Sequence, residues 1–239
     1  MRCLAFVISP IAGVCLLVGV RPAAACGLTP PIGPNGLPAT CHGDEAEVRV
    51  RAGVVVGGTS TRIDFGHESA PLLQGALSAT LDVLPIERLA LSANLGASAP
   101  GRLDYIGQRY ELRPGPIVGL GVGYRWFGGT RPFVHTSLTF SLARSAVVAP
   151  DGSASTLTSS DYRVGVAVGK TFAGVVAPFV AARYFGAGTR WSVAGHGGDH
   201  FRYQLAAGAA FALSQHFDAL AELAFLGEKR ASLGVGYVF

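Results

Sequence analysis

The sequence predicts an all-β protein, an antiparallel up-and-down transmembrane β-barrel of ten strands. Apolar residues recur at every second position from about residue 46 to residue 239, which is the period of a β-strand. The connectors between these segments alternate between short and long. The less apolar face of the segments carries Gly, Ala and Ser with single arginines, in place of an ordinary charged surface. Eight strands are the alternative if the first or ninth segment lies outside the barrel.

The composition fits a membrane barrel better than a soluble enzyme. Charged residues make up 14% of the 239 residues, against about 25% in a typical soluble domain, and 33 residues are glycine. Low charge with many apolar residues argues against disorder. The formal net charge is +4, and the arginines are scattered singly, so no basic face is available for nucleic acid.

Residues 1–25 are expected to be a cleavable signal peptide. Arg2 supplies the positive charge, residues 4–20 form an apolar core, and the alanines at 23–25 form a small-residue cleavage site. An uncleaved membrane anchor is less favoured because the Arg-Pro pair at 21–22 interrupts the apolar run. The sequence therefore predicts an exported protein.

Residues 26–45 are expected to form a Pro/Gly-rich periplasmic segment that precedes the barrel domain, residues 46–239. In an exported chain the two remaining cysteines, Cys26 and Cys41, indicate a disulfide. Lipidation of Cys26 is the alternative, since Ala23 to Cys26 resembles a lipoprotein box. That modification would leave Cys41 unpaired, and both possibilities stay open.

The ten strands follow from the alternating segments and from the turns between them. Short connectors follow the even-numbered strands, and longer polar connectors follow most odd-numbered ones, as in bacterial membrane barrels. The long connectors are expected to be extracellular loops at 58–70, 99–113, 145–160 and 188–199. The strands are expected at about 47–57, 71–84, 87–98, 114–127, 132–144, 161–172, 176–187, 200–213, 216–227 and 229–239.

The two faces of each strand distinguish a membrane barrel from a soluble sandwich. A sandwich would carry Lys, Glu and Thr on its solvent faces, whereas small residues with a few arginines suit a confined lumen. After residue 25 no apolar run reaches the ~18–20 residues of a membrane helix, so a membrane protein of this sequence must be a closed barrel. Outward aromatics beside the short turns are expected to form one interfacial belt: Tyr124, Trp126, Phe172, Phe211, Phe217 and Phe239.

The last strand carries the most specific motif, Leu233-x-Val235-x-Tyr237-x-Phe239. Together with the signal peptide and the amphipathic strands, it resembles the small outer-membrane β-barrel proteins of Gram-negative bacteria. That resemblance covers residues 46–239 as architecture and selects no subfamily. It implies that outer-membrane lipid surrounds the barrel and that the barrel-assembly machinery reads the last strand. It leaves the oligomeric state open.

Alternation assigns eight arginines and four carboxylates to the lumen, an expected excess of four positive charges. Such an excess in a narrow low-dielectric passage would favour anions. The alternative is that the charges pair across the lumen and plug it, Glu222 with Arg230 and Asp82 with Arg88. The assigned residues are Arg49, Arg51, Arg88, Arg125, Arg163, Arg183, Arg202 and Arg230, with Glu47, Asp82, Glu222 and Glu228.

No catalytic residue, metal ion or cofactor is expected. His135 and Ser137 resemble the His-x-Ser of the lipid A deacylase barrels, where His activates Ser. Here the two residues face the lumen near the periplasmic end, without a third, orienting carboxylate. His196, Asp199 and His200 suit a metal ion, but no third His or Cys lies nearby.

The favoured function is therefore a narrow pore or passive conduit with an arginine-rich lumen. A non-conducting structural or adhesive barrel that acts through its extracellular loops is the alternative. A membrane-embedded hydrolase acting on lipid or peptide is a distant third.

Overall fold

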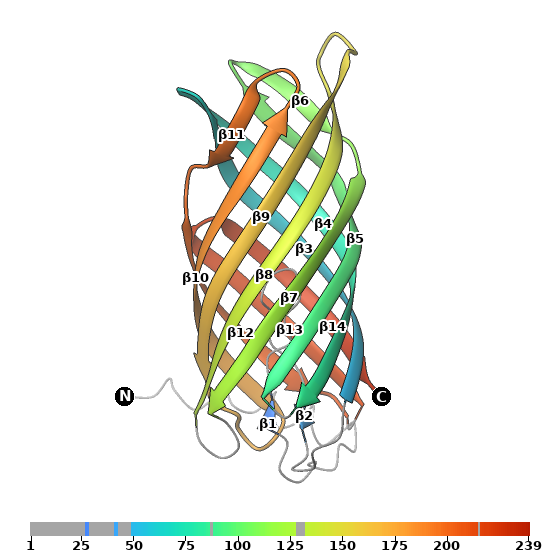
Figure 1. Cartoon of the computed structure of the whole chain (residues 1–239), viewed down its shortest axis with the longest axis vertical. Helices are drawn as coiled ribbons and strands as arrows, with labels where there is room; N and C mark the ends of the chain where they lie inside the picture. The colour runs from blue at the N-terminus through green and yellow to red at the C-terminus, as the bar shows by residue number, and fades with distance from the viewer. Residues whose placement is uncertain (1–26, 29–40, 43–48, 87, 128–131, 215) are drawn as a thin grey trace, which may run out of the picture.

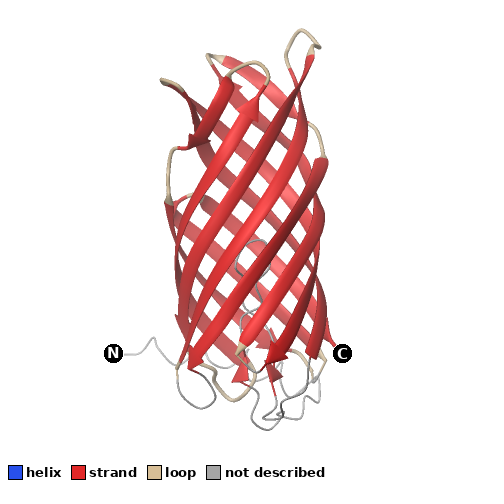
Figure 2. Cartoon of the chain, in the orientation of Figure 1, coloured by secondary structure: helices blue, strands red, loops and turns tan. Residues whose placement is uncertain are grey.

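A computed structural model describes residues 27–28, 41–42, 49–86, 88–127, 132–214 and 216–239 (Figure 1). Every regular element in these ranges is a β-strand (Figure 2). Among the described residues, no helix is both long enough and apolar enough to cross a membrane. The predicted signal peptide, Cys26 and most of the segment 26–45 lie outside the described residues, as does the side chain of Cys41.

Two short strands, β1 (Gly27–Leu28) and β2 (Cys41–His42), pair only with each other. The other twelve strands form one antiparallel sheet. They are β3 (Arg49–Phe65), β4 (Glu68–Ile86), β5 (Leu89–Tyr105), β6 (Gln108–Leu112), β7 (Gly115–Phe127), β8 (Phe133–Val148), β9 (Ala154–Gly169), β10 (Val176–Trp191), β11 (Gly195–Asp199), β12 (Tyr203–Ala212), β13 (Phe217–Gly227) and β14 (Lys229–Val238).

The sheet closes into a barrel because β14 pairs with β3 along ten residues (Figure 1). The prediction of an all-β up-and-down barrel is confirmed. The count is twelve strands because two additional strands, β6 and β11, lie in segments predicted as loops and extend the strand positions of β7 and β12. β6 and β7 lie end to end between β5 and β8, separated by Arg113 and by Pro114, which has no N–H for the ladder. β11 and β12 both pair with β10 and are separated by residues 200–202.

The hairpin of β13 and β14 is shorter than the others. It turns at Gly227, whose φ of +74° lies in the left-handed region. Beyond this turn β11 pairs directly with β3, with Gly198 opposite Asp64. The wall therefore has ten strand positions over most of its height and eight at the end where β11 lies.

The prediction of four long loops is wrong, because strands run through all four of these connectors. Only tight turns remain, at 66–67, 106–107, 149–153 and 192–194. The corrected segments are 58–70, 99–113, 145–160 and 188–199.

A change of polarity along the strands explains this error. On β3 the inward residues include polar Arg51 and Thr59 in the lower part of the strand and apolar Ile63 and Phe65 near its end. Ile63 and Phe65 are buried, whereas Arg62, an outward residue between Thr59 and Ile63, is exposed. The alternation continues, but the apolar residues move from the outer face to the inner face. One end of the barrel therefore has the polarity of a water-soluble barrel and the remainder that of a membrane barrel. Outward Leu77, Leu95, Leu120, Val180 and Leu223 represent the apolar belt of that remainder.

The predicted assembly motif lies on the belt. Leu233, Val235, Tyr237 and Phe239 all point outward, and Phe239 is 72% exposed. The rings of Phe217 and Tyr237 meet edge to face at 5.0 Å, as do those of Tyr237 and Phe239. This cluster gives the end of β14 an aromatic outer surface; its recognition by the assembly machinery stays a prediction.

We assign the end with the polar outer wall to the extracellular side, because outer-membrane barrels carry their longer hairpins there. We call this end, from about Thr59 on β3 upward, the extracellular extension. Ser153 lies in the turn between β8 and β9 at that end, and Ala173 lies in the turn between β9 and β10 at the opposite end. A cysteine placed at Ser153 is expected to react with a membrane-impermeant thiol reagent on intact cells. A cysteine at Ala173 should react only after the outer membrane is permeabilised. The reverse pattern would invert the assigned orientation.

Candidate functional site in the barrel interior

Arg51 joins three strands of the wall at the periplasmic end of the lumen. Its Nη1 donates to Asp82 on β4 at 2.9 Å, and its Nε and Nη2 donate to the two carboxylate oxygens of Asp218 on β13 at 2.7 and 2.6 Å. All three side chains are at most 4% exposed. We call these residues the Arg51 cluster. A charge at this depth requires such partners because an unpaired one is strongly penalised.

Gly236 on β14 makes the Arg51 cluster possible. Strand β14 lies between β3, which carries Arg51, and β13, which carries Asp218. A Cβ built on Gly236 would lie 2.2 Å from the Arg51 guanidinium. The absence of a side chain at this position lets arginine cross an intervening strand.

A larger set of charges lies across the middle of the lumen, and we call it the Glu228 network. Arg183 on β10 donates to both carboxylate oxygens of Glu222 on β13, at 2.8 and 2.5 Å. It also donates to Oε1 of Gln204 on β12 at 2.8 Å. The amide of Gln204 donates in turn to the Glu228 carboxylate at 3.1 Å. Strands β10, β12 and β13 and the turn between β13 and β14, which holds Glu228, are thereby linked through the interior.

The other half of the Glu228 network comes from β9. Arg163 donates to both oxygens of Glu228, at 2.9 and 3.0 Å, and to Asp161 at 2.6 Å. Arg230 donates to the Thr59 hydroxyl at 2.9 Å and lies 3.4 Å from Glu228. Two-pronged Arg–carboxylate pairs of this kind are geometrically specific and strong. The network consists of Asp161, Arg163, Arg183, Gln204, Glu222, Glu228 and Arg230.

The structure places the twelve predicted lumen charges as follows. Arg88 and Arg202 are exposed and lie outside the strands, where alternation does not apply, so they are not among the buried interior charges. Arg230 is half-buried, and Glu47 and the side chain of Arg49 lie outside the described residues. The others are buried in the interior: Arg51, Asp82, Arg125, Arg163, Arg183, Glu222 and Glu228.

The partners of the two carboxylates differ from the suggested ones. Glu222 lies opposite Ser232 of β14 in register, and Arg183 reaches it from β10. Asp82 lies opposite Arg51 in register and pairs with it. Arg88, the partner suggested from the sequence, is in an exposed turn.

The predicted excess of four positive charges is wrong. Among the described side chains the interior holds five arginines and six carboxylates. The carboxylates missed from the sequence include Asp161 and Asp218. Each has the same strand parity as an assigned residue, Asp161 with Arg163 and Asp218 with Glu222, so alternation could have found both. The sixth, Asp199, lies in a segment read as a loop.

An apolar layer closes the extracellular end of the interior. Trp191 is fully buried at its centre, with the rings of Tyr110, Tyr105 and Phe65 at 4.9, 5.3 and 5.7 Å. The indole N–H donates to Ser155 Oγ at 2.9 Å. We call this layer the cap. Around the four aromatics it contains Ile63, Ala70, Leu103, Leu112, Val147 and Leu157, all buried.

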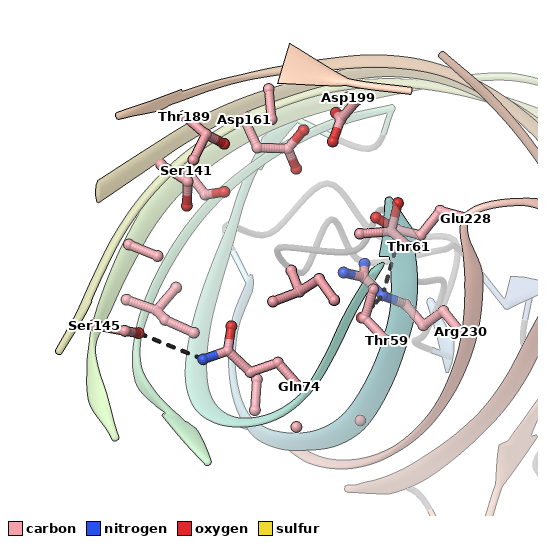
Figure 3. A pocket seen from close by; sticks show the side chains of 18 of the residues that line it. Thr59, Thr61, Gln74, Ser141, Ser145, Asp161, Thr189, Asp199, Glu228 and Arg230 are labelled. Atoms are coloured by element: carbon pink, nitrogen blue, oxygen red, sulfur yellow. Dashed lines mark hydrogen bonds and ion pairs between the residues drawn. The ribbon is translucent and has the colours of Figure 1, made fainter. Parts of the chain in front are cut away.

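A polar chamber of about 180 Å³ lies between the cap and the Glu228 network (Figure 3). Gln74 donates to Ser145 across one side, while Asp161 and Asp199 lie together on another. Thr61 Oγ1 is buried here without a hydrogen-bond partner among the described residues. Asp199 is the last residue of β11, which belongs to the extracellular extension. Burial and the negative charges of Asp161 and Glu228 raise the pKa of Asp199 to about 7. The hydroxyl-bearing lining is Thr59, Thr61, Ser78, Ser141, Ser145, Ser159 and Thr189.

His135 and Ser137 show no catalytic arrangement in the part of the chain that is described. His135 is buried opposite Arg125 of β7, and its Nε2 has no hydrogen-bond partner there. No group of three or more His, Cys, Asp or Glu residues able to hold a metal ion occurs among the described residues.

No family model matches the sequence, and no curated protein matches it. Solved structures do match. The transport unit of the autotransporter AIDA-I from Escherichia coli gives a TM-score of 0.52 at 11% identity, covering 84% of this chain and 93% of that chain. The translocator domain of the autotransporter NalP from Neisseria meningitidis gives 0.46 at 14% identity, covering 82% and 89%. The N-terminal β-barrel domain of Pseudomonas aeruginosa OprF gives 0.40 at 14% identity, covering 82% and 100%.

The similarity to the AIDA-I transport unit shows the fold: this chain has the closed antiparallel barrel of bacterial outer-membrane proteins. The apolar belt on the outer wall is the surface that such a barrel presents to lipid. The chain therefore has the fold and the apolar outer wall of a transmembrane β-barrel.

Proposed function

We propose that this protein is a sealed outer-membrane barrel that does not conduct ions and that acts through its outer wall and extracellular hairpins. The observation that supports this proposal is a series of side-chain layers in the lumen. The Glu228 network joins Arg163 of β9 to Glu228 across the lumen by charge pairs, and the cap fills the extracellular end with apolar side chains. The Arg51 cluster ties the nearby strands β4, β3 and β13 together below them.

The energies of the two kinds of barrier support a closed state. Separating one partner from a buried ion pair costs about 3–5 kcal/mol because the other charge is left uncompensated. An ion in the cap would lose its hydration among side chains such as Leu103 and Trp191, which offer it no compensating partner. The two barriers lie in series, so opening one still leaves the lumen closed.

A conduit with a gate is the second candidate, and the chamber favours it. A space lined by seven hydroxyls and by Asp161 and Asp199 suits a small polar solute better than a purely structural core. Solute would pass only after both the cap and the Glu228 network rearrange. With interior arginines and carboxylates nearly balanced, such a conduit would lack the strong anion preference expected from the sequence.

Planar-bilayer recording tests the proposal. The purified protein is expected to give no single-channel steps at any applied voltage, because charge pairs and the cap close the described lumen. A general porin in the same bilayers serves as the positive control. Regular conductance steps from the parent would overturn the sealed barrel and support the conduit.

A variant designed to open the lumen sharpens this test. Trp191→Ala combined with Arg163→Ala and Glu228→Ala removes the centre of the cap and the central pair of the network, and should conduct. The matched control, Trp126→Ala with Arg62→Ala and Glu111→Ala, changes the same residue types on the exposed wall and should stay silent. Heat-dependent gel mobility shows that both variants are folded.

A further inference from the structure

The outer wall carries a pair of arginines that the lumen does not explain. Arg144 on β8 and Arg190 on β10 both lie opposite Thr158, which is on the strand between them. All three side chains are exposed on the outer face. Among the described residues neither guanidinium has an ion pair or a side-chain hydrogen bond. Two cations thus flank one hydroxyl without a protein anion to neutralise them.

The spacing allows both arginines to contact one group. Adjacent strands lie ~4.8 Å apart, so the Cα atoms of Arg144 and Arg190 are about 10 Å apart across β9. Two long side chains can converge over Thr158 from that distance. Above Tyr162 and Tyr184, strands β8, β9 and β10 carry no outward Asp or Glu, and the exposed Asp151 lies beyond them in the turn between β8 and β9.

The wall is hollowed beside Arg190. A surface depression of about 280 Å³ is lined there by Thr158, Ser160, Gly188, Arg190, His196 and Gly197. Gly188 and Gly197 contribute only backbone, so the floor is low and the hydroxyl, imidazole and guanidinium groups stand around it. Arg190 lies directly opposite His196 of β11. This is a concave polar site, in contrast to the apolar outer wall below it.

Two tyrosines fix the depth of the depression relative to the bilayer. Tyr162 and Tyr184 point outward with ring centroids 6.4 Å apart, and each is nearly half exposed. Tyrosine concentrates at the membrane interface because its ring is apolar and its hydroxyl is wet. Ser160 is the next outward residue on β9, and outward Val164 and Val166 lie on the lipid side. The depression is therefore at headgroup level, immediately above the hydrocarbon region.

We propose that this site, formed by Arg144, Thr158, Arg190 and His196, binds a phosphate on the headgroup of the outer-leaflet glycolipid. A guanidinium presents two N–H groups in the geometry of phosphate oxygens, and charge-assisted bonds of this kind are the strong ones. Clusters of basic residues beside a membrane-spanning surface are the usual sites for anionic headgroups. The acyl chains of the same molecule would lie along the valines and tyrosines below. This proposal goes beyond the sealed barrel and does not depend on it.

The test measures binding of diphosphoryl lipid A to the purified barrel in detergent, by native mass spectrometry. The variant Arg144→Gln/Arg190→Gln is expected to bind roughly tenfold more weakly than the parent, since two charge-assisted contacts are lost. The matched control Arg62→Gln/Arg109→Gln removes the same charge from other exposed positions and should bind as the parent does. Equal binding by the parent and by the Arg144/Arg190 variant would overturn the proposal.

Two further arms identify the source of the phosphate. Lipid A from which both phosphates have been removed should bind to the parent as weakly as diphosphoryl lipid A binds to the Arg144/Arg190 variant. Inorganic phosphate at millimolar concentration should not displace diphosphoryl lipid A, because it lacks the acyl chains. Displacement by inorganic phosphate would show a site for a free anion and would overturn the lipid assignment. Conductance plays no part in this test, so its failure leaves the sealed barrel standing.

Discussion

Replacing Arg51 with methionine is expected to lower the free energy of unfolding by about 3–5 kcal/mol. The change leaves two buried carboxylates, Asp82 and Asp218, without the guanidinium that both accept from. Their mutual repulsion adds to the loss of three hydrogen bonds. Urea unfolding of the protein in lipid vesicles measures the effect. Arg62→Met, on the same strand but exposed, should change stability by about 0.5 kcal/mol or less.

A combined variant separates the ion pairs from simple packing. Arg51→Met with Asp82→Asn and Asp218→Asn removes all three charges, and it should be more stable than Arg51→Met alone. Replacing a whole buried ion cluster is commonly tolerated, whereas removing one partner is not. If Arg51→Met costs no more than Arg62→Met, the Arg51 cluster does not hold these strands together.

The alternation of the sequence was sufficient to predict which residues of β13 face inward, but not what they bind. Glu222 and Asp218 share one face because strand side chains alternate. Their partners depend on the shear of the closed barrel, which sets how far along its neighbour each strand begins. Arg51 reaches Asp218 across β14 because Gly236 has no side chain, and no pattern within one strand reveals such a contact.

The extracellular extension was missed because its polarity is reversed. Above Thr59 on β3, apolar Ile63 and Phe65 turn inward while Arg62 and Asp64 turn outward. If a strand is expected to keep one apolar outer face along its whole length, this reversal is taken for the end of the strand. A test for period two alone would have continued the strand to Phe65. The cap and the arginine site lie in this region, so neither could be located from the membrane pattern.

Replacing Trp191 with alanine is expected to open the chamber to the extracellular side. The ring fills the centre of the cap, where it contacts Phe65, Tyr105 and Tyr110. Removing a buried tryptophan costs about 3–5 kcal/mol and leaves a cavity among the remaining rings. A cysteine placed at Ser159, in the chamber lining, should then react with a membrane-impermeant thiol reagent added outside the cell. In the parent background that cysteine should stay protected.

The second tryptophan supplies the matched control. Trp126 is 52% exposed on the outer wall at the periplasmic end, so Trp126→Ala should leave the Ser159→Cys site protected. Protein without the added cysteine gives the background from native thiols. The Trp191→Ala variant should still conduct no ions, because the Glu228 network closes the lumen below the chamber. Labelling of Ser159→Cys with Trp191 intact would mean that the cap does not seal the barrel. Conductance from Trp191→Ala alone would mean that the network beneath it is not a barrier.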